Sequence, residues 1–314
     1  MPANLAANIS MNKKNTKLGA KKSSDAINKS LLKDIYKKRD SDSRKYDFGY
    51  LLVIGGSHHY CGASYLSAMA AMRAGCDMVR VIAPQRASDT IAGYSPNLSS
   101  VPLDGTIIEK RHVDTLIQET NVVEAVSGGK CAVLIGGGIS RSPETKEAVV
   151  SYLSQVNVPT IVDAEGIHAL EGNQSVIADK KILLTPHAYE FFILTGKKTD
   201  GLTLEQKAEL VCGEAARLRT TIVLKGKTDI LSDGKRTMLG HTGNALMTKG
   251  GLGDTLAGIA GALMARGVDP FTVGSAAAYI NGAAGEIAGA KYGESMCATD
   301  LIEAIVQVLP KIKY

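Results

Sequence analysis

The carboxylate of Asp254 stands at the end of a glycine-rich loop, in the stretch TGNALMTKGGLGDTLAG that covers 242–258. Gly250, Gly251 and Gly253 precede it, and apolar residues at helical spacing follow it. Glycines let backbone N–H groups converge, and a helix start adds partial positive charge, so the loop suits an anion. A carboxylate beside an anion can remove the proton from a hydroxyl that attacks a phosphoryl group. We therefore interpret Asp254 as a catalytic base, the alternative being a helix N-cap. The stretch matches neither a P-loop nor a dinucleotide-binding GxGxxG.

The elements that would position this loop alternate between short apolar runs and helical stretches. A hairpin with an Asp233-Gly234 turn is expected over 229–239. Strands are expected over 50–54, 78–84, 131–135, 159–164, 181–186 and 220–226, and helices over 63–74, 254–266, 272–289 and 299–308. Strands that alternate with helices predict an α/β fold, a mostly parallel sheet with helices on both faces.

Residues that can do chemistry follow several of these strands directly. They are Gly55-Gly56-Ser57, Gly136–Gly138, Asp163, Thr185–Glu190 and Lys225-Gly226. Because the carboxyl ends of parallel strands meet at one edge of a sheet, we expect these loops to converge there. Asp163 fits either a functional carboxylate or a cap of the helix that follows it.

Charge and composition limit the classes of function. The 314 residues carry a net charge of +5, but residues 1–45 hold 12 Lys and Arg against four Asp, and the rest holds 24 basic against 27 acidic residues. We expect 1–45 to be a basic, disordered tail with a short helix within 27–38, and 46–314 to be one domain. The body has no charge pattern for nucleic acid, and no apolar run is long enough to cross a membrane. The five unpatterned cysteines indicate reduced thiols of a cytoplasmic protein.

Six stretches, in order over about 48–310, resemble one enzyme family. The loop at 242–258 resembles the GxGD region of the ribokinase-like superfamily, and most closely that of the ADP/ATP-dependent NAD(P)H-hydrate dehydratases. The other five stretches are VIGGSHHYCGASYLSAMAAMRAGCDMVRV, LIGGGISRS, VDAEGI, LLTPHAYEF and VLKGKTDIL. The chain departs from the family pattern at Gly137, Ser140, Glu165, Ala188-Tyr189 (for Pro-Gly), Ala245-Leu246 (for Pro-Gly) and Lys249.

This resemblance implies a ribokinase-like three-layer sandwich and a repair reaction. Members transfer a phosphoryl group from ADP or ATP, with Mg²⁺, to the hydroxyl of hydrated NADH or NADPH, and phosphate elimination restores NAD(P)H. A kinase of a small alcohol on the same fold is the alternative, and a non-catalytic nucleotide-binding protein is a third. Kinases of the superfamily tend to carry Asn where this chain has His187, so His187 favours the dehydratase.

The resemblance also implies roles for residues of this sequence. Asp254 would be the base, and Glu190 would help to order Mg²⁺ or its waters. The anion hole would be formed by the backbone of Gly250, Gly251, Leu252 and Gly253. The nucleotide would be bound by Lys225, Gly226, Lys227, Thr228, Asp229 and Gly253. The hydrate would be contacted by Ala63, Gly138, His187 and Asp254.

The remaining expectations concern the setting of the enzyme. The stand-alone layout and the stretch ATDLI near the C-terminus favour ADP over ATP as donor. About 45 residues precede the first expected strand, too few for the epimerase domain of many relatives, so we expect a separate NAD(P)H-hydrate epimerase in the same pathway. The resemblance implies a homotetramer. The preference between NADH hydrate and NADPH hydrate stays open.

Overall fold

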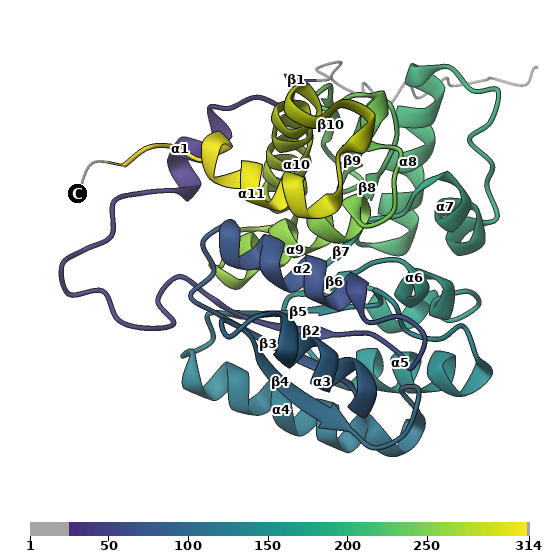
Figure 1. Cartoon of the computed structure of the whole chain (residues 1–314). Coiled ribbons are helices and arrows are strands. Elements are labelled where there is room, and N and C mark those ends of the chain that lie inside the picture. The colour runs from purple at the N-terminus through teal and green to yellow at the C-terminus, as the bar shows by residue number, and fades with distance from the viewer. Residues whose placement is uncertain (1–24, 313–314) are drawn as a thin grey trace, which may run out of the picture.

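The computed structural model describes residues 25–312 and contains one ten-stranded sheet (Figure 1). Its strands are β1 (Asp25–Ala26), β2 (Tyr50–Ile54), β3 (Met78–Pro84), β4 (Ser99–Leu103), β5 (Cys131–Ile135), β6 (Thr160–Val162), β7 (Ile182–Leu184), β8 (Thr221–Leu224), β9 (Asp229–Ser232) and β10 (Thr237–Gly240). The order across the sheet is β1-β10-β9-β8-β7-β6-β5-β2-β3-β4. Strand β9 is antiparallel to β8 and β10, and the other neighbours are parallel.

Helices cover both faces of the sheet, because each strand sends alternate apolar side chains to opposite faces. Leu51 and Val53 of β2 join one buried cluster, whereas Leu52 and Ile54 join the other. The first cluster is covered by α1 (Leu31–Ile35), α2 (Gly62–Arg73), α3 (Gln85–Tyr94), α9 (Leu252–Ala265), α10 (Pro270–Tyr292) and α11 (Ala298–Val308). The second is covered by α4 (Val113–Val126), α5 (Pro143–Gln155), α6 (Glu165–Ala169), α7 (Ala188–Thr195) and α8 (Leu204–Leu218). The expected three-layer α/β sandwich is confirmed, and no helix of the described part is long and apolar enough to span a membrane.

The expected elements lie within three residues of their observed bounds, including the antiparallel hairpin β9–β10. Strand β4 has no counterpart among the expectations. It contains Pro102 and lies at the sheet edge, where a missing N–H donor is tolerated. Short 3-10 turns complete the chain at η1 (Lys110–His112), η2 (Gln174–Ile177), η3 (Ala245–Met247) and η4 (Gly293–Ser295).

The expected boundary of the N-terminal tail needs correction. Residues 1–24 lie outside the described part, but from residue 25 onward the chain packs on the domain: β1 pairs in parallel with β10. The expected short helix is present as α1, and Leu32 of α1 is fully buried. Tyr36 donates its hydroxyl to the carbonyl oxygen of Ala74 (2.9 Å), and Arg39 pairs with Asp77 (2.8 Å). The apolar Leu32 and Tyr36 anchor this basic segment to the core cluster.

Helix α9 contacts β2, β5 and β6 and packs closely on α2. A methyl group on Gly258 would overlap the carbonyl oxygen of Ser67, so the two backbones touch there. Ser67 in turn donates its hydroxyl to the carbonyl oxygen of Asp254 (3.0 Å). From α10, buried Asn281 donates to the carbonyl oxygen of Leu252 (3.2 Å). These links hold the first turn of α9, which carries Asp254.

Candidate active site

The loops that follow β2, β5, β6, β7 and β8 meet at one edge of the sheet, as the sequence predicts, because these strands are neighbours in the sheet. The N–H of Gly56 donates to the carbonyl oxygen of Gly137 (2.9 Å) and joins the loops after β2 and β5. A methyl group on Gly136 would overlap the carbonyl oxygen of Asp163, so the loops after β5 and β6 require glycine where they touch.

Asp163 is the buried centre of this edge, with 2% of its surface exposed. Its Oδ1 accepts hydrogen bonds from the hydroxyl of Thr185 (2.7 Å) and from Nζ of Lys225 (2.9 Å). The N-cap of α6 is Ala164, so Asp163 is not the cap of that helix. Ala164 has φ of 48° and ψ of −124°, a backbone strain of the kind that tightly determined functional loops retain.

Lys225 places its ammonium group between two carboxylates. Its Nζ lies 2.9 Å from Oδ1 of Asp163 and 3.7 Å from Oε2 of Glu190, and 19% of its side chain is exposed. Burial lowers the pKa of Lys225, but the charges of Asp163 and Glu190 outweigh this effect and raise it. A methyl group on Gly253 would lie 3.3 Å from this Nζ. The ammonium group therefore borders the expected anion hole.

His187 and Glu190 form a capping box at the start of α7. Nδ1 of His187 accepts the N–H groups of Tyr189 and Glu190 (both 3.1 Å), and Oε2 of Glu190 accepts the N–H of His187 (2.8 Å). Because Nδ1 is an acceptor, the ring proton of neutral His187 resides on Nε2, and the side chain is 50% exposed. Burial raises the pKa of Glu190, whereas Lys225 lowers it. Nε2 of His187 lies 3.3 Å from Oε1 of Glu190, so both ring nitrogens face polar groups at the start of α7 while half of the side chain stays exposed.

Asp254 is the third residue of α9, so the helix begins two residues earlier than expected. The N-cap is Gly251, with φ of 91°, and no side chain caps the helix, which rules out the N-cap interpretation of Asp254. Burial and, to a smaller extent, the neighbouring charge of Asp163 raise the pKa of Asp254 to about 7 against the opposing charge of Lys225. A carboxylate with this pKa is suited to general-base catalysis at neutral pH.

The expected anion hole is open on the side of the site. The N–H groups of Leu252 and Gly253 belong to the first turn of α9 and have no acceptor four residues earlier within the helix. A methyl group on Gly250 would meet nothing within 4 Å, whereas one on Gly251 would meet Leu66 (2.7 Å) and Ala298 (2.8 Å). Gly251 is therefore needed for the fold, and the space beside Gly250 is free for an anion.

The expected nucleotide loop is the turn between β8 and β9. Oδ1 of Asp229 accepts the N–H of Gly226 (2.9 Å) and closes this turn. Burial raises the pKa of Asp229 to about 6 against the opposing effects of this hydrogen bond and of Lys225. Gly226 and Lys227 are exposed and Thr228 is half-buried, so the turn presents backbone and a cation to solvent.

Two of the expected substrate-contacting residues, Ala63 and Gly138, border the other side of Asp254. A methyl group on Gly137 would lie 3.0 Å from Oδ1 of Asp254 and 3.3 Å from Cβ of Ala63. A methyl group on Gly138 would lie 3.4 Å from Cβ of Ala63 and 3.2 Å from the ring of Tyr60. The sequence expectations omit Tyr60, which is 48% exposed. The sequence signal for Tyr60 is its position directly after the glycine loop that follows β2, which indicates a place near the site.

The donors at this edge fit a magnesium ion that arrives with a nucleotide. Mg²⁺ prefers one or two carboxylates together with phosphate oxygens and water. Asp163 and Glu190 supply buried carboxylates, but both are already engaged by Lys225. Among residues 25–312, no group of three His, Cys, Asp or Glu side chains could hold a metal ion. The residues therefore fit indirect, water-mediated contact and not a resident metal centre.

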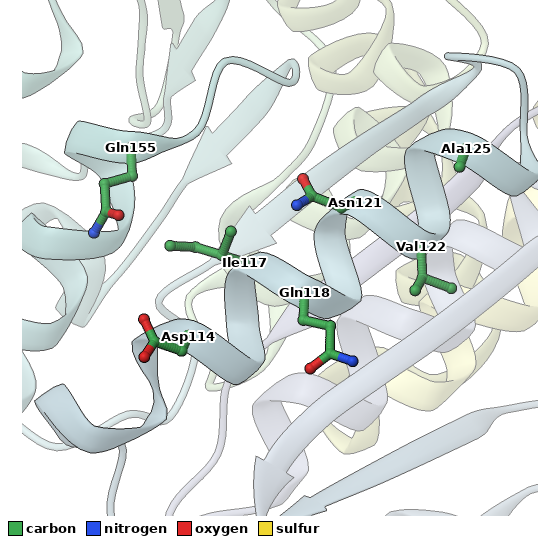
Figure 2. A pocket seen from close by; sticks show the side chains of 7 residues that line it. All are labelled: Asp114, Ile117, Gln118, Asn121, Val122, Ala125 and Gln155. Atoms are coloured by element: carbon green, nitrogen blue, oxygen red, sulfur yellow. The ribbon is translucent and has the colours of Figure 1, made fainter.

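A separate cavity of about 580 Å³ lies along α4. Figure 2 shows that its lining side chains come from successive turns of α4, with Gln155 at the end of α5. The lining is formed by amides, aliphatic side chains and the carboxylate of Asp114. It includes none of the strand-end loops, and it brings together neither a base nor an anion hole.

Comparisons with known proteins agree with this geometry. A family model described as NAD(P)H-hydrate dehydratase matches residues 51–307. The chain is 36% identical over 273 residues to an ADP-dependent (S)-NAD(P)H-hydrate dehydratase of Cenarchaeum symbiosum, which covers 86% of this chain and 92% of that one. It is 37% identical over 278 residues to a bifunctional NAD(P)H-hydrate repair enzyme of Pyrobaculum aerophilum, which covers 88% of this chain and 53% of that one. The chain therefore spans about half the length of such bifunctional relatives.

Solved structures share the architecture. The ADP/ATP-dependent NAD(P)H-hydrate dehydratase of Bacillus subtilis, co-crystallised with ATP and Mg²⁺, has a TM-score of 0.73 and 25% identity over 90% of this chain and 96% of that one. A ribokinase of Thermotoga maritima has a TM-score of 0.51 and 16% identity over 82% of this chain and 99% of that one. The fold is therefore ribokinase-like.

Proposed function

This chain belongs to the NAD(P)H-hydrate dehydratase family, and from that premise we propose that it restores NADH and NADPH from their hydrates with ADP or ATP as phosphoryl donor. The observation that carries the proposal is the position of Asp254. Its pKa of about 7 suits a base, and its carboxylate stands between an open helix start bordered by Lys225 and the glycines of the β5 loop.

The first stage of the proposed reaction is phosphoryl transfer. Ionised Asp254 accepts the proton of the hydrate's hydroxyl while that oxygen attacks the terminal phosphorus of the donor. The bond from this phosphorus to the bridging oxygen breaks, and the nucleotide leaves one phosphate shorter. The N–H groups of the first turn of α9 and the ammonium group of Lys225 stabilise the charge on the transferring phosphoryl group. A positioned base of this kind typically contributes about 10²–10⁴-fold to the rate.

The second stage is elimination of phosphate from the nicotinamide ring. The lone pair of the ring nitrogen expels the phosphate as the carbon–oxygen bond breaks. The adjacent ring carbon then loses a proton, which the departing phosphate accepts, and the double bond of NAD(P)H is restored. A hydroxyl on the same carbon is a poor leaving group, so the phosphoryl donor makes the dehydration possible.

His187 supports the dehydratase over the small-alcohol kinase. Its half-exposed ring lies at the sheet edge that carries Asp163 and Lys225, with Nε2 3.3 Å from Oε1 of Glu190, and in the proposal Nε2–H turns from this carboxylate to a carbonyl or hydroxyl of the substrate. The names of the relatives, which are dehydratases and repair enzymes, support the same choice.

Magnesium would enter the site with the donor, held by phosphate oxygens and by waters that Asp163 and Glu190 order. It would supply charge neutralisation for the phosphates. Binding of the nucleotide base and ribose is proposed for the turn at 226–229, with Gly226, Lys227, Thr228 and Asp229 beside Lys225 and Gly253.

The setting of the reaction is part of the proposal. A separate epimerase would interconvert the two hands of the hydrate, and the bifunctional names of the longer relatives support its place in the same pathway. We also propose a cytoplasmic homotetramer with a preference for ADP. Sedimentation of the purified protein tests the tetramer, and side-by-side rates with the two nucleotides test the donor.

The deciding experiment uses chemically hydrated NADH and hydrated NADPH. Each is incubated with the protein, Mg²⁺ and either ADP or ATP, and the absorbance of the reduced cofactor and the free phosphate are followed together. A dehydratase returns both signals in equal amounts. A kinase would leave a stable phosphorylated product with neither signal, and a non-catalytic binding protein would leave the hydrate unchanged.

A further inference from the structure

A second cavity, of about 270 Å³, adjoins the candidate active site. Its ionisable lining is formed by Arg141, Lys146, Glu165, His168 and Glu171. Arg141 follows the β5 loop that carries Gly138, and its guanidinium group pairs with Glu165 (3.2 Å). The charge of Glu165 also acts on Asp254 and raises its pKa, so the cavity begins beside the reacting carboxylate.

The polar groups of this cavity are only partly satisfied. Lys146 has no ion pair within residues 25–312, and Nε2 of His168 is buried without a hydrogen-bond partner. Burial and the charge of Arg141 lower the pKa of His168, so its imidazole is neutral near pH 7. A buried polar atom without a partner costs stability, which is offset when a ligand supplies the missing hydrogen bond.

An exposed aromatic surface continues from the cavity. The ring of Tyr189 lies 6.0 Å from that of His168, and it is stacked at 6.5 Å and 30° on His187. Tyr189 is 57% exposed, although a large aromatic side chain on the surface forgoes the burial that usually stabilises it. In the family pattern LTPHPGEF a glycine occupies this position, so the tyrosine is a feature of this chain.

We propose that the cavity and Tyr189 bind the adenylate half of the dinucleotide hydrate, an inference that rests on the proposed function. With the substrate hydroxyl at Asp254, the molecule extends along the loop to Arg141 and Lys146, which bind its pyrophosphate. Its adenine stacks on the ring of Tyr189. The site therefore selects the hydrated dinucleotide over a hydrated nicotinamide mononucleotide.

The test compares the hydrates of NADH and of reduced nicotinamide mononucleotide, with Tyr189→Ala and, as control, Tyr94→Ala, a tyrosine 56% exposed at the end of α3. Loss of one stacked base typically weakens binding about 5- to 150-fold, so we expect Tyr189→Ala to raise KM for the dinucleotide hydrate by that factor with kcat unchanged. KM for the mononucleotide hydrate stays as in the wild type. Lys146→Met raises the dinucleotide KM as well and reduces its salt dependence.

Direct binding of NADH and of reduced mononucleotide, followed by fluorescence, separates this inference from the proposed function. If the wild type turns over neither hydrate, the proposed function is wrong. Even then, a loss of NADH binding confined to Tyr189→Ala and Lys146→Met supports a binding site for the adenylate half of a dinucleotide. Equal effects on both ligands, or none, overturn it. A change of sedimentation in Tyr189→Ala without a dinucleotide-specific effect also overturns it and assigns the tyrosine to a contact between copies of the chain.

Discussion

Replacement of Asp254 by Asn is expected to abolish turnover and to stabilise the fold at neutral pH. The folded state holds the Asp254 proton more tightly than the unfolded chain, because burial raises the pKa from its ordinary 3.8 to about 7. Between these two pH values the folded protein therefore binds more protons than the unfolded one, and its stability falls as the pH rises. Asn resembles the neutral acid and avoids this loss. Catalysis needs the ionised form, so activity of the wild type falls as the pH drops below about 7.

The magnitude follows from the same pKa values. At about 1.4 kcal/mol per pH unit, a rise from 3.8 to about 7 corresponds to about 4 kcal/mol, and solvent at the half-buried carboxyl reduces this to about 2–4 kcal/mol. Urea unfolding at a series of pH values measures the difference between Asp254→Asn and the wild type. It should be near zero below 3.8 and reach its full size above about 7.

Two results would refute this reasoning about Asp254. A stability difference that does not change with pH would show that the carboxyl titrates alike in the folded and unfolded states. Turnover retained within tenfold of the wild type would show that another group is the base, because a positioned base contributes about 10²–10⁴-fold. Glu209→Gln, at an exposed carboxylate of α8, is the matched control and should change neither quantity.

Further predictions concern the surroundings of this base. Lys225→Met should lower the free energy of unfolding by about 3–5 kcal/mol, because its two carboxylate partners stay buried without a counter-charge; urea unfolding measures this, and an unchanged midpoint contradicts the ion-pair assignment. Gly251→Ala should lower the free energy of unfolding by about 1–3 kcal/mol because of the positive φ at this position, whereas Gly250→Ala should leave it nearly unchanged. Urea unfolding measures both variants, and equal effects would contradict the inference that only Gly251 requires glycine. His187→Asn keeps a side chain that can cap α7, so the variant should melt at the wild-type temperature while turnover of the hydrate falls. A fall in the melting temperature together with the turnover would assign His187 a purely structural role. Binding of ADP without Mg²⁺ near pH 7 should be accompanied by proton uptake, because the phosphates raise the pKa of Asp254. Calorimetry in buffers of different ionisation enthalpy measures the uptake, and the same uptake by Asp254→Asn would show that another group takes the proton.

The convergence of the strand-end loops could be predicted from the sequence because it depends on a local rule. Gly136–Gly138, Asp163 and Lys225 each follow an apolar run of strand length, and parallel strands bring their carboxyl ends to one edge. The helical spacing predicts a start at Asp254, two residues after the observed start at Leu252, because Gly251 supplies the N-cap and a glycine N-cap gives a weak sequence signal.

The contacts that tune the site depend on distant parts of the chain, and no local pattern encodes them. Lys225 lies 62 positions from Asp163, and their ion pair forms only because β6, β7 and β8 are neighbours in the sheet. Tyr60 comes close to Gly138 through a loop of irregular backbone. The pairing of residues 25 and 26 with β10 joins segments more than 200 positions apart at the sheet edge, and the basic composition of the N-terminal segment conceals it. Propensity and periodicity describe such residues singly, whereas their function arises from the contact.

The groups around Asp254 destabilise its ionised form, and buried hydrogen bonds nevertheless keep the residue in place. Burial and the charges of Asp163 and Glu165, opposed by Lys225, keep Asp254 near its pKa of about 7. An anionic donor would be repelled by these carboxylates without the N–H groups of α9 and a divalent cation, so donor, cation and base must be present together. The buried links from Ser67 and Asn281 to the first turn of α9 oppose any movement of Asp254 toward solvent, where its pKa would return to the ordinary range and its strength as a base would fall.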